Sequence, residues 1–188
     1  TNCAEHKALA LEAAHRSIVL LKNEGGLLPL DQSRLRSLAV IGPNAASVRL
    51  GGYSGDPGCG ESVIEGIRKK VGDLVEVLYA EGCGLTQAPG TAHDLWVQDD
   101  VRASDAARDA SLINEAVDTA QNADVTLLVL GDNEQTCREG WSTMHLGDRD
   151  SLDLPGRQED LLRAVVATGK PVILLLLQGR PASINFAA

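Results

Sequence analysis

Apolar residues along the chain fall into two kinds of segment. Short, largely apolar runs predict strands, and runs of this length suit strands that are buried on both faces. Between these runs, apolar residues recur every three or four positions and predict helices. The predicted strands cover residues 38–42, 75–79, 125–130 and 172–177, and the predicted helices cover residues 6–21, 62–72, 104–122 and 155–167.

The alternation of strands and helices predicts the fold class. A strand, a helix and a second strand in succession form a right-handed crossover, which makes neighbouring strands parallel and covers the sheet with helices. We therefore expect an α/β fold, a three-layer sandwich with a mostly parallel sheet flanked by helices. The 188 residues are enough for one such domain, residues 1–188, in which residues 1–37 form a lead-in helix and linker.

Composition and charge narrow the class of ligand. The chain has 17 Lys and Arg against 26 Asp and Glu, a net charge of −9, which argues against a nucleic-acid partner. Its longest apolar run, residues 172–177, is far shorter than the roughly 20 residues of a membrane span, so we expect no membrane partner.

Metal ligands and cofactor motifs are not evident in the sequence. The four cysteines and four histidines have no zinc-ligand spacing, and no glycine-rich phosphate fingerprint is present, so we predict neither a metal nor a cofactor. A chain of this size does not need disulfides, and the best candidate pair is Cys59 with Cys83.

Two loops that follow predicted strands have unusual content. Ligands of an open parallel sheet bind at the carboxyl ends of its strands, where these loops begin. The first loop, residues 50–62, contains five glycines and Tyr53, one of only two tyrosines in the chain. A flat aromatic ring suits the face of a sugar, although Tyr53 packing against the rim of the domain is the alternative.

The second loop, residues 131–156, is far longer than an ordinary connection and is rich in acidic residues. Such a loop on a compact scaffold suits binding or catalysis. An apolar neighbour such as Trp141 raises the pKa of a carboxylic acid, as a general acid requires, which favours Glu139 and keeps Glu134 in reserve. The alternative for these charges is a structural role, and we expect this part of the loop to be braced by Asp148, Arg149 and Asp150.

Five segments resemble glycoside hydrolase family 3, specifically the second domain of its β-glucosidases, β-xylosidases and related exo-acting enzymes. They cover nearly the whole chain in order. These segments are AAHRSIVLLKNEGGLLPL, LAVIGPNA, LGGYSG, VTLLVLG and GDRDSLDLPGRQEDLLRAVVATGKPVILLLLQGRP.

The resemblance implies retaining hydrolysis of a non-reducing terminal β-linked sugar. An N-terminal (β/α)8 barrel would supply the nucleophilic aspartate, and the loop after a central strand of this domain would supply the general acid/base. Glu139 is the positional match to that acid/base, with Glu134 as the reserve, and the sugar or aglycone contacts fall on Tyr53, Arg138 and Trp141. Because no barrel is present, we expect a domain fragment that is inactive without its barrel domain.

Two other functions remain open at this point. A non-catalytic carbohydrate-binding module would use Tyr53, Trp141 and the acidic loop without chemistry. A nucleotide-binding α/β domain is less favoured, because the phosphate fingerprint is missing and the charge is acidic. The sequence does not specify the sugar, the linkage or the cellular compartment.

Overall fold

The computed structural model describes residues 3–51, 58–87, 101–140 and 146–187. The chain divides into two compact units, Thr1–Leu30 and Asp31–Ala188. The smaller unit contains helix α1, Ala4–Ser17, and a 3-10 turn, η1, Glu24–Gly26. Helix α1 ends four residues before the predicted boundary, and none of its residues is buried.

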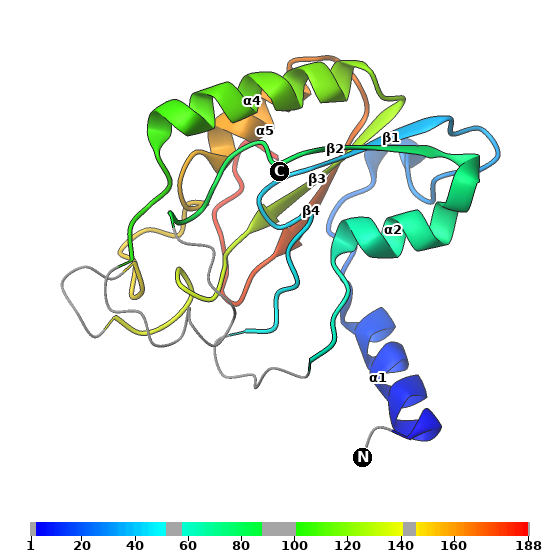
Figure 1. Cartoon of the computed structure of the whole chain (residues 1–188), viewed down its shortest axis with the longest axis horizontal. Helices are drawn as coiled ribbons and strands as arrows, with labels where there is room; N and C mark the ends of the chain where they lie inside the picture. The colour runs from blue at the N-terminus through cyan, green and yellow to red at the C-terminus, as the bar shows by residue number, and fades with distance from the viewer. Residues whose placement is uncertain (1–2, 52–57, 88–100, 141–145, 188) are drawn as a thin grey trace. The chain divides into compact units, whose positions relative to one another are not determined.

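The larger unit is built on a sheet of four parallel strands (Figure 1). Their order is β2-β1-β3-β4, so the second strand along the chain lies at one edge. Each strand lies within one residue of its predicted bounds, and the predicted parallel sheet is confirmed. The strands are β1 (Ser37–Ile41), β2 (Glu76–Ala80), β3 (Val125–Gly131) and β4 (Val172–Leu177).

Helices cover both faces of this sheet, which confirms the three-layer α/β class. Figure 1 shows α4 and α5 on one side of the sheet and α2 on the other. The helices are α2 (Val63–Val71), which runs into a 3-10 turn, η2 (Gly72–Leu74), α4 (Ala106–Gln121) and α5 (Gln158–Val166).

Local side chains set where two of these helices begin. Ser62 caps α2 in a reciprocal capping box, in which the Ser62 and Glu65 side chains each accept a hydrogen bond from the other residue's N–H group. Helix α4 begins two residues later than predicted, because the carboxylate of Asp105 accepts the N–H of Arg108 at 2.7 Å and makes Asp105 the cap.

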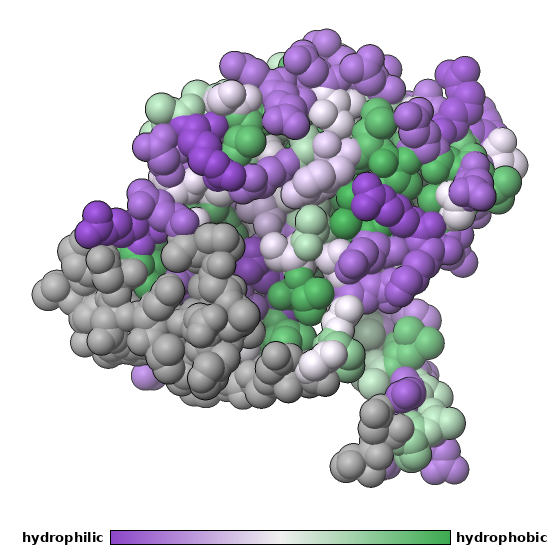
Figure 2. Space-filling view, viewed as in Figure 1, coloured by the Kyte–Doolittle hydropathy of each residue, from purple (hydrophilic) through white to green (hydrophobic). Residues whose placement is uncertain are grey.

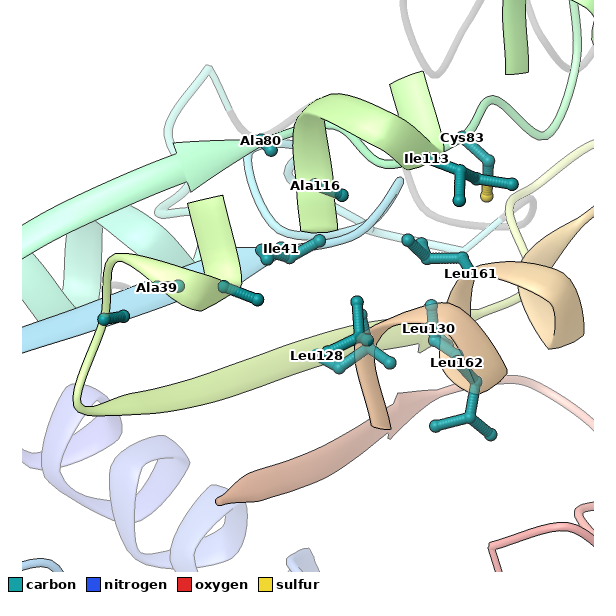
Figure 3. Close-up of a cluster of buried hydrophobic side chains, with 13 residues drawn as sticks. Ala39, Ile41, Ala80, Cys83, Ile113, Ala116, Leu128, Leu130, Leu161 and Leu162 are labelled. Carbon is teal, nitrogen blue, oxygen red and sulfur yellow. The ribbon is translucent and has the colours of Figure 1, made fainter. Parts of the chain in front are cut away.

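The core lies between the sheet and the α4–α5 layer and is made of aliphatic side chains and the thiol of Cys83 (Figure 3). Strand residues Ile41, Leu128 and Leu130 are fully buried there and meet Ile113 of α4 and Leu161 of α5. This cluster contains no aromatic side chain, in keeping with an aromatic content of 3%. The outward surface of α4 is mostly hydrophilic, as Figure 2 shows.

A buried glutamine fixes the start of α5 to the end of β3. The Gln158 side-chain oxygen accepts the N–H of Gly131 at 2.8 Å. Its amide nitrogen donates to the carbonyls of Gly131 and Pro155, both at 2.9 Å. Gln158 is fully buried, so these bonds satisfy backbone groups that water does not reach.

We expect Gln158→Leu to lower the free energy of unfolding by about 2–4 kcal/mol, because it leaves buried N–H and carbonyl groups of Gly131 without partners. Glu159→Gln, one position along the same helix, is the matched control and removes only an exposed ion pair, worth about 0.5 kcal/mol. Urea unfolding of both variants measures the difference. Equal midpoints for the two variants would contradict the role given to Gln158.

Candidate functional site

The loops that leave β1 and β3 are joined at the carboxyl edge of the sheet. The side-chain amide of Asn44, two residues after Gly42, donates to the carbonyl of Asp132 at 3.0 Å. Asn44 is fully buried, and Asp132 follows the last residue of β3 directly. The segment that leads from β1 toward the first candidate loop, residues 50–62, is therefore joined to the start of the second, residues 131–156.

Glu134 is buried and anchors the loop after β1. One of its carboxylate oxygens accepts the N–H of Leu50 at 3.1 Å, and the other lies 3.2 Å from the Nη1 atom of Arg49. Arg49 also donates to the side-chain oxygen of Asn44 at 2.8 Å. The Glu134 side chain is 3% exposed, so both of its oxygens are committed to groups within the domain.

Two opposing effects act on the pKa of the Arg49 guanidinium. Burial lowers the pKa of its guanidinium, and the neighbouring Glu134 carboxylate acts in the opposite direction. A guanidinium stays protonated near neutral pH even when its pKa is lowered. Arg49 and Glu134 therefore form a charged pair that holds the two loops together.

A second ion pair braces the long loop from within. The Nη2 atom of Arg149 lies 2.9 Å from the carboxylate of Asp132, and its Nη1 atom donates to the carbonyl of Asp153 at 2.9 Å. Both members of the pair are largely buried, with 16% and 3% of their side chains exposed. Arg149 thus braces the loop as expected, with Asp132 as its ionic partner.

Glu139 is exposed, unlike Glu134, and its backbone is held on both sides. The N–H of Asp148 donates to the carbonyl of Arg138 at 3.1 Å, and the carboxylate of Asp148 accepts the N–H of Gly140 at 2.8 Å. No side chain in the described part of the chain is bonded to the Glu139 carboxylate. The backbone of Glu139 is thus held in place, while the residue itself is exposed to solvent.

The other predicted site residues are only partly placed. The side chain of Arg138 is 4% exposed, and its predicted contact with a sugar stays a prediction. Tyr53 and Trp141 lie outside the described residues, and so does any effect of Trp141 on a neighbouring carboxylic acid. Asp148 and Arg149 form bonds within the loop, as predicted for bracing residues. Asp150 is exposed, and no bond joins it to another side chain of the described residues.

Sequence reasoning missed Asn44 and Arg49. Their only local signal is that they are polar and follow a buried strand, which is common in surface loops. Their partners lie far away in the sequence, 88 residues from Asn44 to Asp132 and 85 from Arg49 to Glu134. No spacing rule along the chain connects them.

The cysteines of the described residues form neither a disulfide nor a metal site. Cys59 and Cys83, the candidate disulfide pair, are free thiols. Burial raises the pKa of the Cys83 thiol to about 12, which makes it a poor nucleophile near neutral pH. Within residues 3–51, 58–87, 101–140 and 146–187, no three metal-binding side chains come together, and no helix has the length and apolarity to cross a membrane.

The chain is similar in sequence to parts of larger glycosidases. The chain is 43% identical over its whole length to a β-xylosidase of Formosa agariphila, of which it covers 24%. It is 36% identical over 95% of its length to a periplasmic β-glucosidase of Salmonella typhimurium, of which it covers 23%. The chain thus spans about a quarter of the length of these relatives.

Solved structures support the same relationship. A β-glucosidase from Erythrobacter marinus superposes on 97% of the chain with a TM-score of 0.85 and 44% identity, and the match covers 25% of that enzyme. Residues 18–188 match the model of the glycosyl hydrolase family 3 C-terminal domain. The chain therefore belongs to glycosyl hydrolase family 3.

Proposed function

We propose that this domain is part of an exo-acting retaining β-glycosidase, a β-glucosidase or β-xylosidase, and that Glu139 is its general acid/base. The observation that carries the assignment is the contrast between two carboxylates of one loop. Glu139 is exposed, whereas Glu134 is buried with both oxygens bonded. The relatives named as β-xylosidase and β-glucosidase support the reaction class.

The chemistry requires a carboxyl group with access to the substrate. In a retaining glycosidase one carboxyl group attacks the anomeric carbon, and a second, about 5–5.5 Å away, protonates the leaving oxygen and later activates water. The second group exchanges protons with the substrate and with water, so its oxygens must face the cleft. The exposure of Glu139 supports this role.

Glu134 fits a structural role instead. To reach a glycosidic oxygen, its carboxylate would have to give up the bonds to Arg49 and to the N–H of Leu50. Removing one member of a buried ion pair leaves the other charge uncompensated, which is costly. Glu134 therefore holds the loop after β1 in place while Glu139 does the chemistry.

The proposal extends to the nucleophile and to the residues that contact the substrate. The nucleophilic carboxylate comes from the N-terminal barrel domain of the complete enzyme. Tyr53, Arg138 and Trp141 contact the sugar or its aglycone, with the two aromatic rings available for stacking on sugar faces. The reaction uses acid/base and nucleophilic carboxylates and needs no metal or cofactor.

We expect Glu139→Gln in the full-length enzyme to slow hydrolysis of an unactivated disaccharide about 10²- to 10⁴-fold, because its leaving group needs protonation. An activated aryl glycoside has a good leaving group, so its first step should be affected much less. Azide should restore turnover of the aryl substrate, because it attacks the glycosyl-enzyme without a general base. Steady-state rates on both substrates, with and without azide, test this.

Glu134→Gln is the matched control for that experiment. It should lower the free energy of unfolding by about 1–3 kcal/mol, because it weakens the bond to a buried guanidinium. It should not change the ratio of the rates on the two substrates. A near-normal disaccharide rate in Glu139→Gln, combined with leaving-group dependence in Glu134→Gln, would transfer the acid/base role to Glu134.

We also expect residues 1–188 alone to hydrolyse neither 4-nitrophenyl β-glucoside nor the β-xyloside, because a single carboxylate does not complete a retaining site. Calorimetric titration with glucose, xylose and cellobiose should show no binding at millimolar concentrations. Millimolar or tighter binding without hydrolysis would instead favour a carbohydrate-binding module.

A further inference from the structure

Asp148 bonds to the backbone on both sides of Glu139. Its N–H donates to the carbonyl of Arg138, the residue before Glu139, at 3.1 Å. Its Oδ2 atom accepts the N–H of Gly140, the residue after Glu139, at 2.8 Å. One residue therefore fixes the two peptide groups that flank Glu139.

The backbone of Asp148 adopts an unusual conformation to make these bonds. Its φ is 47°, and in the described part of the chain it is the only residue other than glycine with a positive φ. Asp and Asn tolerate this left-handed region better than most residues, yet it remains a strained conformation. Such strain persists where the surrounding structure requires the conformation, and functional sites are where it is most often found.

Asp148 is itself held to the sheet through its neighbour. Arg149 forms the largely buried ion pair with Asp132, and the N–H of Asp132 donates to the carbonyl of Leu177 at the end of β4 at 3.0 Å. A continuous set of bonds thus runs from the sheet through Asp132 and Arg149 to the residue that clamps Glu139. The backbone that bears the exposed Glu139 carboxylate is therefore bonded, through these residues, to the sheet.

We propose that Asp148 is a positioning residue for the general acid/base, acting through the backbone of Glu139 and not through contact with substrate. The inference rests on the proposed acid/base role of Glu139. Proton transfer to a leaving oxygen requires the acid within hydrogen-bond reach of it, and a misplacement of about 1 Å can cost about 100-fold in rate. No side chain of the described residues bonds to the Glu139 carboxylate, so within this part of the chain the bonds from Asp148 to the two adjoining peptide groups are what hold Glu139 in place.

Two substitutions separate the carboxylate from the backbone conformation. Asp148→Gly keeps the N–H and permits a positive φ but removes the acceptor for the N–H of Gly140. Asp148→Asn keeps both an oxygen acceptor and tolerance of the left-handed region, so it is the conservative rescue. Asp150→Gly, an exposed aspartate two positions away, is the matched control.

In the full-length enzyme, Asp148→Gly should lower kcat/KM on an unactivated disaccharide about 10- to 100-fold. On an activated aryl glycoside kcat/KM should change by less than about threefold, because it reports the first step, in which protonation of a good leaving group contributes little. Asp148→Asn and Asp150→Gly should both stay within about threefold of wild type on both substrates.

Equal losses on both substrates would indicate a merely structural effect and overturn the proposal, as would failure of Asp148→Asn to restore the rate. The double variant Asp148→Gly/Glu139→Gln gives a further check: it should be no slower on the disaccharide than Glu139→Gln alone, because Asp148 acts through Glu139. Additive losses would also overturn it.

Different results would contradict the acid/base role of Glu139 and the positioning role of Asp148. If Glu139→Gln alone leaves the disaccharide rate intact, the proposed acid/base is wrong. If Glu139→Gln is slow and Asp148→Gly is normal, only the positioning role is wrong.

Discussion

The site depends on how closely neighbouring strands approach at their carboxyl ends. Gly131 ends β3 with a φ of 136°, and a Cβ atom there would overlap the carbonyl oxygen of Leu177 in β4. Gly42 follows β1 with a φ of 129°, and its Cβ would overlap the carbonyl oxygen of Val129 in β3. Only glycine fits both the space and the backbone conformation at these two positions. As a result, two loops leave the sheet close together, and Asn44 reaches Asp132.

Two pairs of buried, opposite charges lie at this edge, and pairing is the condition under which a domain tolerates such charges. Glu134 with Arg49 and Asp132 with Arg149 each combine a carboxylate with a guanidinium and add hydrogen bonds to the backbone. Pairs of this kind add little net stability, because desolvation consumes much of the attraction. Their effect is geometric, since each fixes one loop relative to the sheet.

Accessibility then divides the acidic residues of one loop by role. The buried carboxylates of Asp132 and Glu134 hold the structure, while the carboxylate of Glu139 faces solvent on an anchored backbone. A retaining glycosidase needs a second carboxyl group opposite the acid/base. In the proposed function, this domain contributes one carboxyl group of that pair, and the barrel domain of the complete enzyme contributes the other.

The sequence by itself determined the strands and the parallel sheet, because apolar runs and helical spacing are local signals that burial on a sheet reinforces. It also singled out the acidic loop and, within it, Glu134 and Glu139 as candidates. It favoured Glu139 over Glu134, but only the tertiary structure showed their difference in burial, by bringing Arg49 to Glu134 across 85 residues and leaving Glu139 exposed. Burial and pairing depend on contacts between distant segments, and no local pattern records which of two nearby glutamates will find a partner.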